Sequence, residues 1–262
     1  TWVPGHFHMT VGTAVAQQAA DQLTRVQCEM GGKNPTVVMP SADMEAAVEI
    51  VAGGGFGTTG QSCTACSRAI VHSDVLDAFT DALVAHAEAL TVGPGLSGAD
   101  MGPQVNASEL ASTLGYVERA AEAGATVATG GEAVSVPEAP EGHFVAPTVI
   151  TDVTPDMEIA QSEVFGPVIA VLAVDSFDAA VTVANDVPYG LSASIVTGDL
   201  TEAHRFTDRA EAGVVKINEK TTGLALHAPF GGFKDSSTNT YREQGEAGLD
   251  FFSATKTVYI NY

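Results

Sequence analysis

The stretch VIAVLAVDSFDAAVTVANDVPYGLSASIVTGDLTEAHRFTDRAEAGVVKIN, residues 168–218, decides the fold class. It contains three apolar runs of strand length, and segments with helical spacing of apolar residues lie between them. The runs are residues 168–174, 191–198 and 214–218, and the helical segments are residues 177–186 and 201–213. Strands that alternate with helices are typical of a parallel sheet covered by helices. The stretch therefore predicts an α/β protein with a mainly parallel sheet.

The same alternation occupies the preceding part of the chain. Apolar runs predict strands at residues 23–29, 34–40, 67–74 and 125–131, and helical spacing predicts helices at residues 42–54, 74–90 and 108–124. We expect Asp74 to cap the second of these helices and Gly124 to end the third. No repeat or low-complexity linker interrupts the pattern, so the Pro- and Gly-rich stretches 93–103 and 135–143 are predicted to be surface loops.

The composition is strongly acidic. The 262 residues are 45% hydrophobic and include 32 Asp and Glu against 11 Lys and Arg, for a formal net charge of -21. Nucleic acid is excluded as an expected partner because binding it requires a basic face. The acids are spread among helix-spaced apolar residues, which predicts a solvated acidic surface suited to high salt; an acidic protein without such adaptation is the alternative.

Several features bear on location and on the ends of the chain. No apolar run reaches the ~18 to 20 residues of a membrane span, no signal-peptide pattern is present, and three cysteines are too few for a disulfide framework. We therefore expect a cytoplasmic protein with no membrane association.

Thr1 is not an initiator residue, which suggests truncation. His6 and His8 form an H-x-H pair without further ligands nearby, so we expect no metal site.

The glycine-rich stretch GFGTTG, residues 55–60, matches the dinucleotide-binding pattern G-x-G-x-x-G. In that setting the pattern follows a strand and opens a helix, whereas here a helix-patterned run precedes it. We interpret these glycines as residues that let the chain pass closely over another element.

The stretch GQSCTACSR, residues 60–68, contains two of the three cysteines, Cys63 and Cys66. A zinc ribbon requires a second C-x-x-C pair, which the chain lacks, while a redox dithiol remains an alternative. The third reading is a single nucleophile at Cys63, at the start of a helix whose amides lower the thiol pKa. Such a nucleophile needs a group that activates water, and Glu29 is the candidate.

Five blocks in order resemble signatures of the aldehyde dehydrogenase superfamily, from about residue 11 to the C-terminus. The blocks are CEMGGKNP (28–35), GQSCTACSR (60–68), SEVFGPV (162–168), NDVPYGLSASI (185–195) and APFGGFKDSS (228–237). The segments NEKTTGLALH (218–227) and SSTNTYREQG (236–245) are similar to the branch that oxidises 2-oxoglutarate semialdehyde, also called 2,5-dioxopentanoate.

The resemblance implies an aldehyde substrate, NAD or NADP as cofactor, and a thioester intermediate. Cys63 matches the nucleophile and Glu29 the general base. Glu163 matches the carboxylate that binds the nicotinamide ribose, and Phe165 the aromatic residue beside the nicotinamide. We interpret the remaining matches as follows: Cys66 and Cys28 as packing residues, Arg68 as structural, and Lys234 as either a substrate contact or a solvated loop residue.

The resemblance covers the C-terminal half of the family's sequence, and GHFHMT replaces its usual Gly- and Ser-rich turn. It implies that residues 1–32 end a dinucleotide-binding domain, residues 33–235 form the catalytic thiol domain, and residues 236–262 return to an oligomerisation strand. We expect a homo-oligomer, dimer or tetramer, and no dehydrogenase activity from this chain alone. The alternative is a non-catalytic remnant or a C-x-x-C thiol-redox domain.

Overall fold

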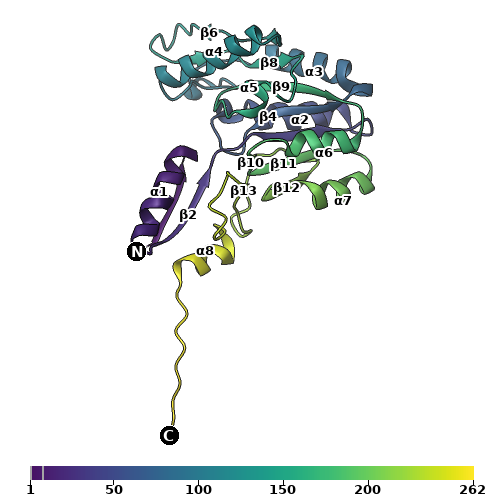
Figure 1. Ribbon diagram of the computed structural model, residues 1–262. Helices are drawn as coiled ribbons and strands as arrows, with labels where there is room; N and C mark the ends of the chain where they lie inside the picture. The colour runs from purple at the N-terminus through teal and green to yellow at the C-terminus, as the bar shows by residue number, and fades with distance from the viewer. Residues whose placement is uncertain (1, 8) are drawn as a thin grey trace.

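A seven-stranded sheet lies at the centre of the computed structural model (Figure 1). The structure describes residues 2–7 and 9–262, with side chains from residue 9 onward. The strand order is β12-β11-β3-β4-β9-β8-β5, and every adjacent pair is parallel except β5 with β8. The bounds are β3 (Asn34–Val38), β4 (Cys66–His72), β5 (Thr126–Thr129), β8 (Thr148–Thr151), β9 (Val168–Val174), β11 (Ser192–Val196) and β12 (Val214–Ile217). The predicted α/β class with a mainly parallel sheet is confirmed.

Helices cover both faces of this sheet (Figure 1). Val38 and Val71 pack with α2 (Met44–Gly55) and α3 (Leu76–Ala89), whereas their neighbours Val37 and Ile70 pack with α6 (Phe177–Asn185) and α7 (Leu200–Arg209). Successive side chains of a strand point to opposite faces, so a strand buried on both sides must be apolar throughout. This is why β9 is a continuous apolar run, and why β3 and β4 are apolar at Val37–Val38 and Ala69–Val71. A third cluster holds α4 (Ala107–Glu122) and α5 (Glu158–Gln161) against β8 and β9.

The N-terminal segment forms a separate two-stranded unit. Strand β1 (Trp2–Phe7) pairs in parallel with β2 (Arg25–Met30), and α1 (Met9–Asp21) connects them. Figure 1 shows α1 and β2 beside the seven-stranded sheet and not on either of its faces. From Met30 the chain passes through two glycines directly into β3, so the end of β2 lies next to the main sheet.

The remaining elements are short. Two further two-stranded sheets pair β6 (Ala133–Val134) with β7 (Phe144–Val145), and β10 (Tyr189–Gly190) with β13 (Phe233–Lys234). Three 3₁₀ turns are η1 (Gly57–Gly60), η2 (Ser73–Val75) and η3 (Gly95–Ser97), and the last helix is α8 (Gly245–Phe252). No helix in the described part of the chain is long and apolar enough to cross a membrane.

Two local predictions are wrong. Cys63 does not precede a helix: it lies in a turn, and the chain then enters β4 at Cys66. Asp74 does not cap α3, whose N-cap residue Val75 makes no side-chain capping bond. At the C-terminus, α8 contains Phe251 and Phe252 and buries Phe251, and residues 253–262 belong to no helix or strand, so the oligomerisation strand stays a prediction. Gly124 follows α4 with φ of 100°, as expected of a residue that ends a helix.

Candidate functional site

A cavity of about 550 Å³ lies beside the amino ends of β3, β4 and β9. Its walls come from the end of β2, the turn before β4, helix α4 and the segment between α5 and β9. In open α/β sheets ligands usually bind beyond the carboxyl ends of the strands, so this cavity lies at the opposite edge. All four residues predicted to form the site line it: Glu29, Cys63, Glu163 and Phe165.

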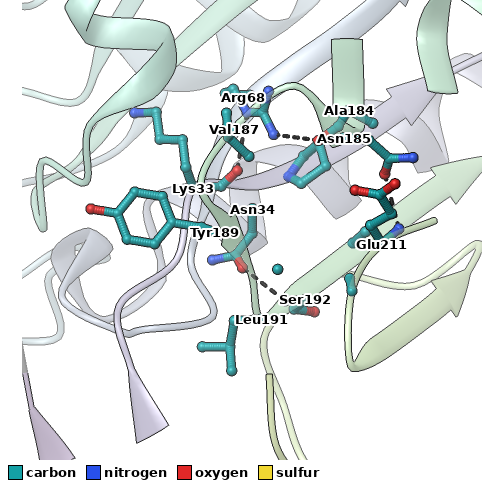
Figure 2. A pocket seen from close by; sticks show the side chains of 14 residues that line it. Lys33, Asn34, Arg68, Ala184, Asn185, Val187, Tyr189, Leu191, Ser192 and Glu211 are labelled. Carbon is teal, nitrogen blue, oxygen red and sulfur yellow. Dashed lines mark hydrogen bonds between the residues drawn. The ribbon is translucent and has the colours of Figure 1, made fainter. Parts of the chain in front are cut away.

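The turn that carries Cys63 is fastened to the sheet by one side chain. Asn34 Nδ2 donates hydrogen bonds to the carbonyl oxygens of Cys63, at 2.8 Å, and Ala65, at 2.9 Å. Asn34 Oδ1 accepts the backbone N–H of Ser192 at 2.9 Å (Figure 2). Because Asn34 begins β3 and Ser192 begins β11, these bonds fix the turn relative to two strands and hold the half-buried Cys63 at the cavity.

A glycine lets two cavity walls approach each other. Gly60 has φ of 67°, and a Cβ there would lie 2.1 Å from the carbonyl oxygen of Gly166. No other residue type fits both this left-handed backbone and this close contact. Gly55 and Gly60 of GFGTTG thus serve close passage, as predicted, whereas a Cβ on Gly57 would meet nothing within 4 Å; the element before Gly57 is α2 and not a strand.

Glu29 is a buried carboxylate that accepts hydrogen bonds from three donors. Its Oε2 accepts the backbone N–H of Gly232 at 2.8 Å, and its Oε1 accepts Ser237 Oγ at 3.0 Å and Gln27 Nε2. Burial raises the pKa of Glu29 to about 7, although the three hydrogen bonds oppose the rise. A carboxyl group with a pKa near neutrality can take a proton from water and return it at neutral pH.

Glu163 is the second carboxylate of the cavity wall and is half-buried. Its Oε1 accepts the backbone N–H of Gly32 at 3.1 Å. A Cβ on Gly31 would lie only 1.9 Å from Glu163 Oε2, so the glycine at position 31 leaves room for the carboxylate. Burial raises the pKa of Glu163 to about 7, while the Gly32 N–H and the charge of Lys33 oppose the rise. Phe165, 39% exposed, has φ of 56°, a left-handed conformation that is costly for an aromatic residue.

Lys33 was not predicted as a site residue. It is 1% exposed, and its Nζ has no hydrogen-bond partner within the described residues. Burial lowers the pKa of Lys33 to about 7, Arg68 lowers it further, and Glu163 opposes both. The GGK sequence carries no signal of this burial, because a lysine after a glycine turn is usually solvated.

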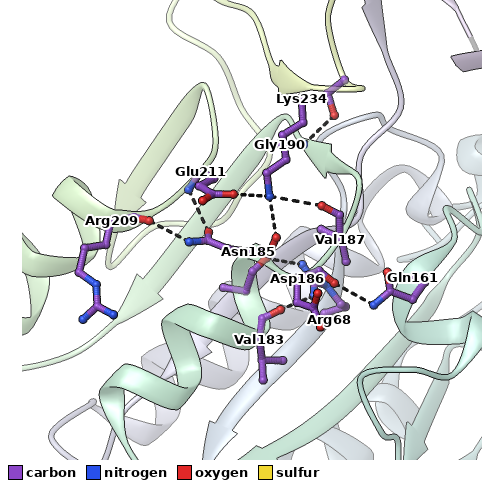
Figure 3. A network of polar contacts seen from close by, with 12 residues as sticks. Arg68, Gln161, Val183, Asn185, Asp186, Val187, Gly190, Arg209, Glu211 and Lys234 are labelled. Carbon is purple, nitrogen blue, oxygen red and sulfur yellow. Dashed lines mark hydrogen bonds and ion pairs between the residues drawn. The ribbon is translucent and has the colours of Figure 1, made fainter.

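Arg68 and Lys234 donate hydrogen bonds to backbone carbonyl oxygens of neighbouring segments. Arg68 donates to the carbonyl oxygens of Lys33 at 3.0 Å, and of Val183 and Ala184 at 2.8 Å (Figures 2 and 3). Lys234 Nζ donates to the Asn185 carbonyl at 2.6 Å and pairs with Glu211 at 2.5 Å (Figure 3). Lys234 is therefore not a solvated loop residue, and its expected contact with substrate stays a prediction.

All three cysteines are free thiols. Cys66 is fully buried, with Sγ 3.2 Å from Thr36 Oγ1, and burial raises its pKa; burial also raises the pKa of Cys28. Only Cys63 reaches the cavity. No group of three metal-ligating side chains occurs within the described residues, and His8 of the H-x-H pair lies outside them.

The chain matches the family model described as "Aldehyde dehydrogenase family" over residues 8–258. It is 63% identical over 252 residues to the alpha-ketoglutarate semialdehyde dehydrogenase of Haloferax volcanii, covering 96% of this chain and 52% of the relative. It is 43% identical over 239 residues to the 2,5-dioxopentanoate dehydrogenase of Saccharolobus solfataricus, covering 91% and 49%.

Solved structures of aldehyde dehydrogenases are similar to this chain as well. The NAD⁺ complex of an aldehyde dehydrogenase from Bacillus cereus superposes with a TM-score of 0.94 at 36% identity, covering 99% of this chain and 52% of the other. Betaine aldehyde dehydrogenase from Staphylococcus aureus, in complex with NAD⁺, gives 0.91 at 34% identity, covering 95% and 49%. The chain therefore spans about half the length of the relatives it matches.

Proposed function

Because the chain belongs to the aldehyde dehydrogenase family, we propose that it carries the catalytic thiol and base of an NAD(P)-dependent aldehyde dehydrogenase. One observation supports this most strongly: a single cavity brings together the accessible thiol of Cys63, the buried carboxyl of Glu29 and the half-buried carboxyl of Glu163. A redox dithiol is less well supported, since Cys66 is buried against Thr36 and only Cys63 is accessible.

In the proposed reaction the Cys63 thiolate adds to the aldehyde carbon and forms a thiohemiacetal. NAD(P), when bound, would supply the hydride acceptor, and the thiohemiacetal would lose this hydride and its hydroxyl proton to become a thioester on Cys63. Glu29 then takes a proton from water as its oxygen attacks the thioester carbonyl, which releases the carboxylate product and the Cys63 sulfur. The aldehyde carbon is oxidised by two electrons, and water supplies the added oxygen.

Two residues are proposed to face the cofactor. A carboxylate offers two acceptor oxygens to the pair of ribose hydroxyl donors, and Glu163 presents such a carboxylate at the cavity wall. Phe165 lies on the same wall and is partly exposed, so its ring is available to the nicotinamide. The choice between NAD and NADP lies with residues that bind the adenosine ribose, for which this chain offers no candidate.

We propose a semialdehyde that carries a distal carboxylate as the substrate, with 2-oxoglutarate semialdehyde as its type. The support is the 63% identity to a relative of that name and the 43% identity to a 2,5-dioxopentanoate dehydrogenase. We further propose that the 262 residues alone do not reduce NAD(P), because they span about half of these relatives and hold only the nicotinamide end of the proposed cofactor site.

We propose four further features for a full-length protein: its domain division, its oligomeric state, its location and its adaptation to salt. Residues 1–32 would close a dinucleotide-binding domain, 33–235 would form the catalytic domain, and 236–262 would end in an oligomerisation segment. Exposed apolar side chains at Val258, Tyr259 and Ile260 support the homo-oligomer. The free thiols suit a reducing cytoplasm, and the net charge of -21 suits high salt.

The test separates thiol chemistry from hydride transfer. The 262 residues should slowly hydrolyse an activated aryl ester, because attack and release need no cofactor; Cys63→Ala should abolish this, and Glu29→Gln should slow the release step. Joined to the N-terminal half of the Haloferax volcanii relative, the chain should form NAD(P)H from 2-oxoglutarate semialdehyde. A joined protein whose turnover survives Cys63→Ala would refute the proposed function.

A further inference from the structure

Two polar side chains distant in sequence meet at Glu29. Gln27 lies two residues earlier on β2, so its side chain is on the same face, and it is fully buried. Ser237, 4% exposed, follows β13 and pairs with Glu29 through an antiparallel bridge. We propose that Gln27 and Ser237 are positioning residues that fix the Glu29 carboxylate through Oε1 and favour its ionised form. This inference rests on the proposed role of Glu29 as the base.

The direction of the Gln27 amide follows from its other partners. Gln27 Oε1 accepts the backbone N–H of Tyr241 at 2.8 Å and Thr238 Oγ1 at 3.3 Å. A backbone N–H can only donate, so the atom that faces Tyr241 must be the amide oxygen. The amide nitrogen Nε2 is therefore turned toward Glu29 Oε1 and Ser237 Oγ.

The direction of the Ser237 hydroxyl follows in the same way. Ser237 Oγ accepts Gln27 Nε2 at 2.9 Å and the backbone N–H of Asn239 at 3.0 Å. A hydroxyl has two lone pairs and one proton, and both lone pairs are used by these donors. Its proton must then go to Glu29 Oε1, 3.0 Å away. Gln27 and Ser237 thus both donate to Glu29 Oε1, the Gly232 N–H donates to Oε2, and none of the three offers a lone pair to a proton on Glu29.

This arrangement opposes the cost of burying Glu29. Burial raises the pKa of Glu29 to about 7, and the bonds from Gly232, Ser237 and Gln27 lower it. Other charged or titratable groups lie near Glu29. Glu243 lies before α8 and its charge raises the Glu29 pKa further, while Cys63 and Glu163 line the same cavity. Arg242 lies close by, since a Cβ on Gly231 would be 2.7 Å from Arg242 Nη1 and 2.9 Å from Glu29 Oε1, and Cys28 is the neighbour of Glu29 on β2. The two side-chain donors increase the fraction of the base that is ionised at neutral pH.

The experiment titrates Glu29 directly. The 262-residue chain is labelled with ¹³C at the glutamate carboxyl carbons, and the Glu29 resonance is assigned by its loss in Glu29→Gln. Its midpoint should lie near 7 in the unchanged chain. Gln27→Met keeps the side-chain volume without a donor, and Ser237→Ala removes the hydroxyl; each should raise the midpoint by about one pH unit, as expected for one lost hydrogen bond to a charged group.

Gln104→Met is the matched control. Gln104 is also buried, at 2% exposure, but its amide bonds to Thr113 and not to Glu29. Its substitution should leave the Glu29 midpoint unchanged. Unchanged or lower midpoints in folded Gln27→Met or Ser237→Ala would overturn the inference. If one of these two variants does not fold, the other decides, because each removes a separate donor to Oε1.

A kinetic measurement separates this inference from the proposed function. If Glu29 is the base, the acid limb of ester hydrolysis should move to higher pH with its midpoint, and the decrease should appear in kcat and not in KM. If the variants raise the titration midpoint of Glu29 but the acid limb of ester hydrolysis does not move, Glu29 is not the base. The assignment of the hydrogen bonds from Gln27 and Ser237 would still hold. The titration itself needs no turnover.

Discussion

The side chain of Asn34 and the backbone of Cys63 are joined by a hydrogen bond of 2.8 Å that fixes the thiol-bearing turn to the first residue of β3. Asn34 uses both amide protons, on Cys63 and Ala65, and also accepts from Ser192. An aspartate is nearly the same size but has no proton to donate. It would set a buried carboxylate against two carbonyl oxygens.

We therefore expect Asn34→Asp to lower the free energy of unfolding by about 2 to 4 kcal/mol at neutral pH. The matched control is Asn106→Asp. Asn106 caps α4 by accepting the backbone N–H of Glu109 at 2.9 Å, a role in which an aspartate serves equally well. Urea denaturation measures the free energy of unfolding of both variants. Equal losses in the two variants would contradict the anchoring role of the Asn34 amide.

The second prediction concerns the order in which the cysteines react. A limiting amount of iodoacetamide should label Cys63 ahead of Cys66 and Cys28, since Cys63 lines the cavity while burial raises the pKa of the other two thiols. Peptide mapping after alkylation gives the labelled fractions. Preferential labelling of Cys66, or a resting Cys63–Cys66 disulfide, would favour the dithiol alternative.

Much of the fold could be predicted because its pattern is local. The strands and helices of residues 168–218 each show their own periodicity, and the family blocks place Glu29, Cys63, Glu163 and Phe165, which the structure brings to one cavity. The turn at Cys63 could not be predicted as easily. Thr58 and Thr59 adopt positive φ just before it, and a run of small polar residues does not distinguish a turn from a helix start.

The surroundings of Glu29 could not be predicted from local pattern either. Ser237 contacts Gln27 across 210 positions of sequence, and a glutamine inside an apolar strand gives no indication of its partner. Lys33 is similar, since only the packing of β4 and the Glu163 segment explains its burial. Long-range hydrogen bonds of this kind depend on topology that periodicity does not encode.

The third prediction uses the pKa of Glu163, which burial raises from 4.5 to about 7. The proton bound in the folded state stabilises it fully below about pH 4.5, and this contribution is lost as the pH rises through about 7. Glu163→Gln has no such loss and keeps an oxygen that can accept the Gly32 N–H. Relative to the unchanged chain, it should thus gain stability between these two pH values.

We expect a relative gain of about 1 to 2 kcal/mol above pH 7, less than the full pKa shift gives because Glu163 is only half-buried and solvent screens its charge. Glu138→Gln removes the same charge from an exposed loop position and should show a flat difference across the range. Urea denaturation at a series of pH values gives both curves. A gain that is already present at acid pH, or that declines as pH rises, would contradict burial of an ionisable Glu163.

The last prediction concerns the acidic surface. With a formal net charge of -21, repulsion among exposed acids should destabilise the folded chain once salt no longer screens it. The thermal midpoint should fall as potassium chloride is lowered from molar to tens of millimolar. A variant with Asp81→Asn, Glu122→Gln and Glu138→Gln removes three exposed acids from different elements, and its midpoint should fall less over the same range, because fewer charges repel. Salt acting only on apolar burial would give both proteins the same slope, since these substitutions leave the core unchanged. A midpoint that stays constant or rises as salt is removed would refute the adaptation to high salt.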